Sequence, residues 1–150
     1  MNDIDYMREA YSEALIAYKN GENPIGALVV KNGKIISRAS NAENSKYDPT
    51  AHAEIESIRK ACKKLKQAKL KDCILYTTLY PCPMCEGAII EVGIKKVIFG
   101  GELFKWIKDI KYSNKDLELI GPILNEECRN IFAKRLREKG KDEILNYESS

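Results

Sequence analysis

The chain holds one histidine, His52, and a glutamate follows it two positions later at Glu54. Further along, Cys82 and Cys85 are separated by two residues. Because Pro83 suits the first position of a helix, we expect the two cysteines at positions i and i+3, on one helix face. Two thiolates and one imidazole are ligands that zinc prefers, and a catalytic zinc keeps its fourth position open for water. The pattern predicts a catalytic zinc held by His52, Cys82 and Cys85.

Glu54 fits the remaining need of such a site. Water on zinc has a pKa lowered toward ~7, but hydrolysis also needs a group that accepts and delivers protons. A carboxylate beside the metal can do both, and we assign this catalytic role to Glu54. In mid-helix, His52 and Glu54 would point to nearly opposite sides. They reach one pocket only at the start of a helix, where Pro49 and Thr50 predict one.

Each of these features also has an ordinary explanation. A Cys-x-x-Cys pair alone is also a thiol–disulfide motif, and a single histidine or glutamate is usually a surface or core residue. Their combination, His-x-Glu followed by Pro-Cys-x-x-Cys, matches the signature of zinc deaminases. A redox protein or a structural-zinc protein without catalysis stays open as an alternative. The other cysteines have no such partners, and we interpret them as buried or inert small apolar residues: Cys62, Cys73 and Cys128.

The elements that must position these residues alternate between helix and strand. Apolar residues at helical spacing predict a first helix from Asp3 to Asn20. Asn32-Gly33 between two apolar runs predicts a β-hairpin. A polar loop follows, and the second helix then runs to about Leu65. Next come a strand from Cys73 to Leu79, a short helix that ends at Gly93, and another strand. Strand, helix and strand in so short a segment indicate a parallel βαβ unit.

The rest of the chain adds a short strand in "LELIG" and a helix that Asn125 caps and Gly140 ends. The length favours a single domain over 1–150, with a tail from about residue 141. No apolar run is long enough for a membrane span, and the polar, acidic N-terminus is unlike a signal peptide, so we expect a cytoplasmic protein. A net charge of +3 does not by itself indicate nucleic-acid binding.

Four segments, in order, resemble the cytidine deaminase-like superfamily: "NPIGALVV", "DPTAHAEI", "LYTTLYPCPMCEGAII" and "VIFGG". The similar branch holds bacterial tRNA adenosine deaminases, bacterial guanine deaminases and fungal cytosine deaminases, and the resemblance runs from about residue 5 to 135. It implies an α/β fold, a three-layer α/β/α sandwich around a mixed five-stranded sheet. It also implies one zinc per chain, hydrolytic deamination with Glu54 moving the protons, and a homodimer.

The resemblance further assigns residues to the substrate. Asn41 carries a donor and an acceptor, which suits reading a base or sugar, although a turn asparagine is the ordinary alternative. Ala53, between the histidine and the glutamate, is assigned to the same pocket. Phe104 and Trp106 could stack on a base, or pack in the core or a dimer interface. Asn146 lies in the tail, which closes over the pocket in the fungal family.

The substrate is the least determined feature. The segment after the second motif lacks the Gly/Ala/Ser-rich stretch of tRNA deaminases, and Tyr80 stands where they carry glutamate. The seven basic residues in Arg59 to Lys71 could follow a phosphate backbone, or form a solvated helix face. We predict a free nucleobase or similar small aminated heterocycle as substrate, with cytosine first and guanine second. The alternative is tRNA adenosine deamination at the anticodon wobble position.

Overall fold

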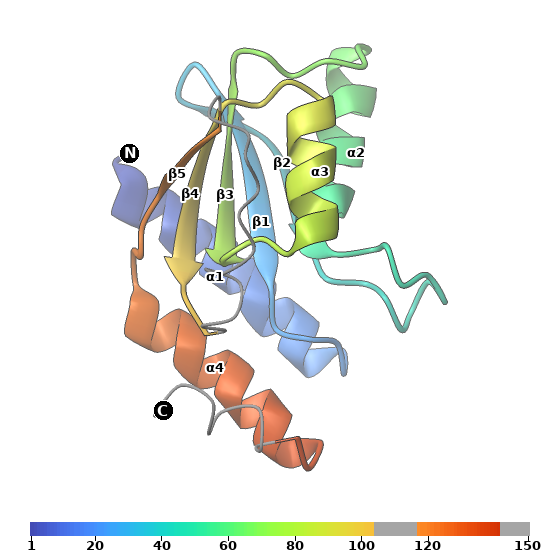
Figure 1. The fold of residues 1–150 in the computed structure, drawn as a ribbon, viewed down its shortest axis with the longest axis vertical. Helices are drawn as coiled ribbons and strands as arrows, with labels where there is room; N and C mark the ends of the chain where they lie inside the picture. Colours follow the sequence, from blue (N-terminus) through green and yellow to red (C-terminus); the bar gives the residue numbers. More distant parts are fainter. Residues whose placement is uncertain (104–116, 142–150) are drawn as a thin grey trace.

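The computed structural model describes residues 1–103 and 117–141 (Figure 1). This part of the chain contains four helices, α1 (Asp3–Lys19), α2 (Ala53–Leu65), α3 (Pro83–Glu91) and α4 (Asn125–Glu138). It also contains five strands, β1 (Gly26–Lys31), β2 (Lys34–Ser40), β3 (Cys73–Leu79), β4 (Lys96–Gly101) and β5 (Glu118–Ile120). No helix in these described ranges is long and apolar enough to cross a bilayer.

The strands form one mixed sheet in the order β2-β1-β3-β4-β5. Strand β1 runs antiparallel to β2 and to β3, whereas β3, β4 and β5 are parallel. Asn32 and Gly33 both have positive φ angles, 50° and 75°, as a two-residue hairpin turn requires. The predicted hairpin, the βαβ unit and the mixed five-stranded sheet are confirmed.

Helices cover both faces of this sheet. Helices α2 and α3 lie on one face, and α1 lies on the other with α4 beside it (Figure 1). Side chains alternate along each strand, so Ala27 and Val29 join the core under α2 and α3, while Leu28 and Val30 pack against α1. The predicted three-layer α/β/α sandwich is confirmed.

Two glycines allow helices to approach the sheet closely. A Cβ atom on Gly26 would lie 2.0 Å from the carbonyl oxygen of Ala10 and 2.6 Å from the backbone nitrogen of Ala14, both in α1. A Cβ atom on Gly100 would lie 2.6 Å from Sγ of Cys128 in α4. The absence of a side chain at these positions therefore lets α1 and α4 pack directly on β1 and β4.

Two predicted helix starts differ from the structure. Helix α2 begins at Ala53, because the Asp48 carboxylate accepts hydrogen bonds from the backbone N–H and hydroxyl of Thr50 and holds a turn there. Asn125 does not cap α4. Leu124 occupies the cap position in a left-handed conformation, and the Asn125 side chain instead accepts a hydrogen bond from the Glu102 backbone N–H.

Candidate active site

The candidate site lies where α2 and α3 begin, at the edge of the sheet where β3 ends. Each helix presents a ligand candidate at its cap, His52 before α2 and Cys82 before α3, and both residues have extended backbone conformations. Pro83 occupies the first turn of α3, as predicted. The two helices are packed side by side on the same face of the sheet (Figure 1). His52 precedes the first helical turn, so the mid-helix geometry that would point His52 and Glu54 to opposite sides does not apply here.

His52, Cys82 and Cys85 are brought together. Their candidate ligand atoms all lie within 4.8 Å of one another. Nδ1 of His52 is 3.6 Å from Sγ of Cys82 and 3.5 Å from Sγ of Cys85. Cys85 is fully buried and the other two are half-buried. The three residues form one compact group from two separate elements.

These distances fit a tetrahedral zinc ion. With Zn–S bonds of about 2.3 Å and Zn–N bonds of about 2.0–2.1 Å, tetrahedral angles place nitrogen and sulfur about 3.6 Å apart. The two measured separations from Nδ1 of His52, 3.6 and 3.5 Å, match this value. Donor type and spacing both suit zinc, with one tetrahedral position left over.

Hydrogen bonds within this group shift the pKa values of its three members. The Cys85 thiol and then the His52 imidazole, by hydrogen bonding, lower the pKa of Cys82 to about 4, although burial opposes this. The hydrogen bond with Cys82 raises the pKa of His52 to about 9, against the effect of burial. The hydrogen bond to Cys82, followed by burial, raises the pKa of Cys85. The lowered pKa of Cys82 favours its thiolate, the form that binds a metal, and metal binding would release the protons that the other members carry.

Glu54 lies beside this group. Its side chain is buried, and Oε1 has no hydrogen-bond partner among the described residues. Burial raises the pKa of Glu54, while hydrogen bonding from Cys85 and the charge of His52 lower it less. A buried carboxylate oxygen with no partner is costly, and such atoms mark places where a ligand or water is expected.

Asn41 is linked to the site by Glu43, a residue that the sequence analysis did not single out. Asn41 is 2% exposed, and its Nδ2 donates to Oε1 of Glu43 over 3.0 Å. The same Oε1 atom lies 3.5 Å from Nε2 of His52. Glu43 stands in a polar loop with no motif around it, so its contact with the histidine is visible only in three dimensions.

The other assigned substrate residues fall into two groups. Ala53 is fully buried as the first residue of α2. Phe104, Trp106 and Asn146 lie outside the described residues, as does most of the tail, and their roles stay predictions.

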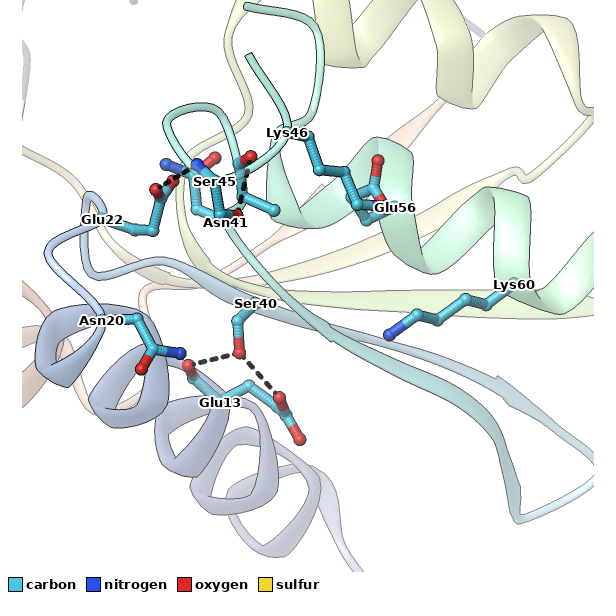
Figure 2. A pocket seen from close by; sticks show the side chains of 10 residues that line it. Glu13, Asn20, Glu22, Ser40, Asn41, Ser45, Lys46, Glu56 and Lys60 are labelled. Carbon is cyan, nitrogen blue, oxygen red and sulfur yellow. Dashed lines mark hydrogen bonds and ion pairs between the residues drawn. The ribbon is translucent and has the colours of Figure 1, made fainter. Parts of the chain in front are cut away.

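A cavity of about 250 Å³ adjoins Asn41, between α1, the end of β2 and α2 (Figure 2). Glu22 lies on its wall and accepts the backbone N–H groups of Asn44 and Ser45, each over 3.0 Å. On the opposite wall, Lys46 points to Glu56 and pairs with it (Figure 2). These contacts of Glu22 and Lys46 hold the loop that carries Asn41 in place.

The basic segment Arg59 to Lys71 runs away from the site. Helix α2 has 13 residues, which is about 20 Å at a rise of about 1.5 Å per residue. The segment beyond it ends near the far end of α3, where Nζ of Lys69 donates to the backbone oxygen of Glu91. Arg59, nearer the site, pairs with Glu56. The lysines at the end of α2 therefore do not line the site.

The remaining cysteines behave as expected from the sequence. Cys73 and Cys128 are buried, Cys62 is half-buried against the core, and burial raises the pKa of all three thiols.

Comparison with known proteins gives one family. The model of the MafB19-like deaminases matches residues 1–136. The tRNA-specific adenosine deaminase of Bacillus subtilis is 40% identical over 148 residues, which cover 91% of each chain. The guanine deaminase of the same organism is 45% identical over 103 residues, covering 68% of this chain and 66% of that protein.

Solved structures agree with these relatives. A structure from a study of A-to-I editing by tRNA:A34 deaminases at the wobble position of transfer RNA is 32% identical, with a TM-score of 0.78. That match covers 85% of this chain and 98% of the other. A guanine deaminase structure from Bacillus subtilis is 44% identical, with a TM-score of 0.66, and covers 69% of this chain. The redox and non-catalytic alternatives are set aside, because the chain belongs to the MafB19-like deaminase family and is a hydrolase acting on C–N bonds.

Proposed function

We propose that this protein is a tRNA adenosine deaminase that converts adenosine to inosine at the anticodon wobble position. The observation that carries the proposal is the end-to-end likeness to the tRNA-specific enzyme, 91% of each chain, against 66% of the guanine deaminase. A substrate pocket is assembled from elements along the whole domain, so a match along the whole chain weighs more than a higher identity over part of it. These relatives favour tRNA adenosine over cytosine, the first choice from the sequence.

Two features of the sequence argued against tRNA as the substrate: Tyr80 in place of a glutamate, and the lack of a Gly/Ala/Ser-rich stretch. The structure gives the first of these a different explanation. The Tyr80 ring packs edge-on against Phe99 with 5.0 Å between ring centres, and its backbone N–H donates to the carbonyl of Gly101. Packing thus accounts for an aromatic residue at this position without reference to substrate. The segment that lacks the Gly/Ala/Ser-rich stretch falls largely outside the described residues.

In the proposed reaction, water adds to the adenine carbon that bears the amino group, and ammonia leaves. His52, Cys82 and Cys85 would hold zinc, whose Lewis acidity makes water a nucleophile near neutral pH. Glu54 would accept one proton of the attacking water and pass it to the adjacent ring nitrogen. It would then take the second proton from the newly formed hydroxyl and deliver it to the amino group, so that the carbon–oxygen double bond forms as ammonia leaves. Its burial and its partnerless Oε1 support this role, because the carboxylate keeps an oxygen free for the reaction.

A second candidate is guanine deamination. The 45% identity to a guanine deaminase favours it, although the match covers about two thirds of each chain. The chemistry would be the same, since guanine also bears an amino group on a ring carbon beside a ring nitrogen.

The two candidates separate in one experiment. The zinc-loaded protein is incubated with a tRNA that carries A34, with a matched tRNA that carries G34, and with free guanine. Inosine is read as A-to-G change after reverse transcription, and ammonia release is measured with guanine. We expect inosine at position 34 of the first tRNA alone, absent with Glu54→Gln. Ammonia from guanine with no inosine would replace the proposal by the second candidate.

We also propose that the protein forms a homodimer. This proposal rests on the resemblance to dimeric relatives, and sedimentation equilibrium of the zinc-loaded protein would measure it.

A further inference from the structure

We infer that Glu43 is a positioning residue whose single oxygen, Oε1, orients both the histidine of the metal group and the amide that meets the substrate. Oε1 of Glu43 lies 3.5 Å from Nε2 of His52 and accepts from Nδ2 of Asn41 over 3.0 Å. This inference rests on the roles proposed above for His52 and Asn41. It adds a residue that neither the motif nor the family signature contains.

The first consequence concerns the tautomer of His52. Nδ1 faces the two cysteine sulfurs, at 3.6 and 3.5 Å, so Nε2 is directed away from them, toward Glu43. A neutral imidazole carries its proton on one nitrogen only, and a carboxylate beside Nε2 favours the proton there. Nδ1 then keeps its lone pair for a metal. Carboxylates that orient a ligating histidine in this way raise its basicity and fix its ring.

The second consequence concerns Asn41. Its NH₂ group is engaged by the Glu43 carboxylate, and the reverse orientation would place two oxygens against each other. The acceptor Oδ1 is therefore the free end of the amide, and it is buried with no partner among the described residues. A substrate group that meets Asn41 should be a hydrogen-bond donor, such as a sugar hydroxyl or a ring N–H.

The backbone of the loop is held by other groups. The Glu22 carboxylate accepts the N–H groups of Asn44 and Ser45. The backbone N–H of Ala42 donates to the carbonyl of Ala51 over 2.9 Å. The Glu43 side chain itself is 27% exposed. Replacing it should leave the loop folded, so a loss of function can be assigned to the two contacts.

The test uses the full-length, zinc-loaded protein and its single histidine. Zinc affinity is measured by chelator competition, and the Nε2–H signal of His52 is followed by ¹⁵N-resolved NMR, where no other histidine overlaps. In Glu43→Ala we expect zinc affinity to fall about 10- to 100-fold, as for other groups that orient a ligating histidine. The Nε2–H proton should also exchange faster with solvent. Glu43→Gln, which keeps an acceptor but no charge, should lie between Glu43→Ala and wild type.

Glu22→Gln is the matched control, since it weakens the fixation of the loop without touching the histidine. We expect it to lower thermal stability and to leave zinc affinity and the Nε2–H signal as in wild type. Wild-type zinc affinity in Glu43→Ala, or an equal loss in Glu22→Gln, would overturn the inference. A protein that binds zinc in this way but forms no inosine would instead overturn the proposed tRNA activity, so the two failures are distinguishable.

Discussion

Sγ of Cys85 lies 3.5 Å from Nδ1 of His52, although 33 positions separate the two residues in the sequence. The contact joins the first turn of α3 to the residue before α2. It therefore depends on the side-by-side packing of these helices on the sheet, and a metal at this point would tie them together.

Removal of either thiolate should remove the metal. Cys82→Ala and Cys85→Ala each leave two of the three donors, so we expect loss of bound zinc and a lower melting temperature, because metal binding couples to folding. Elemental analysis of the purified proteins measures the zinc. Cys62→Ala is the matched control and should keep its zinc, because Cys62 is not part of the group formed by His52, Cys82 and Cys85. Full zinc content in a Cys82 or Cys85 variant would contradict the ligand assignment.

Glu54→Gln should separate binding of the metal from catalysis. Glutamine keeps the size of the side chain but cannot carry protons, so zinc content should stay at one per chain while kcat falls by ~10²–10⁴-fold or more. Inosine formation under single-turnover conditions measures the loss. A zinc-loaded variant with near wild-type kcat would contradict the assignment of Glu54 as proton carrier.

The packing of α1 on β1 predicts a large effect of a small change. In Gly26→Ala the new Cβ would lie 2.0 Å from the carbonyl oxygen of Ala10, so helix and strand must move apart. Overpacking of this kind costs about 1–3 kcal/mol of unfolding free energy. Urea denaturation measures it. Gly87→Ala is the comparison, because nothing lies within 4 Å of its Cβ, and it should keep or raise stability. Equal stability of the two variants would contradict the close approach.

The Glu56 carboxylate predicts a pH dependence of stability. Burial alone would raise the pKa of Glu56, but hydrogen bonds and charges from Lys46 and Arg59 outweigh it and hold the pKa below its ordinary value of 4.5. A lowered folded-state pKa adds stability above the unfolded pKa, and this is lost as the pH falls through the folded value.

Glu56→Gln should therefore be less stable than wild type at pH 7, by about 1 kcal/mol given the exposure of the basic partners. The difference should shrink at pH values below 4.5. Chemical denaturation of both proteins across pH 3–7 measures it. A difference that stays constant over this range would contradict the lowered pKa.

Truncation after Lys141 discriminates between the substrates. A free base is bound by enclosing it, whereas a looped-out nucleotide arrives attached to its backbone and needs an open groove. Under the tRNA proposal we expect the truncated protein to keep its inosine-forming activity. If the protein instead acts on a free base, the truncation should abolish ammonia release from guanine. Loss of inosine formation with zinc retained would contradict the expectation of an open groove.

Local features of the fold followed from the sequence. The Asn32-Gly33 turn, the strand from Cys73 to Leu79 and the proline at the start of α3 were all predictable. Each depends on backbone preferences and on the period of apolar side chains over a few neighbouring residues, which the sequence carries directly. The spacing of His-x-Glu and Cys-x-x-Cys likewise singled out the three side chains that the structure brings together, His52, Cys82 and Cys85, because ligand chemistry belongs to residue types.

Tertiary structure decided the features that join distant segments. The shared oxygen of Glu43 between Asn41 and His52 arises because the loop after β2 folds against the start of α2. The engagement of Asn125 by Glu102, instead of a helix cap, arises in the same way. The lysines from Lys63 onward lie at the far end of α2 because the helix runs away from the site. Such contacts depend on strand order and helix packing, and therefore on the free energy of the whole fold, so no local pattern of residues encodes them.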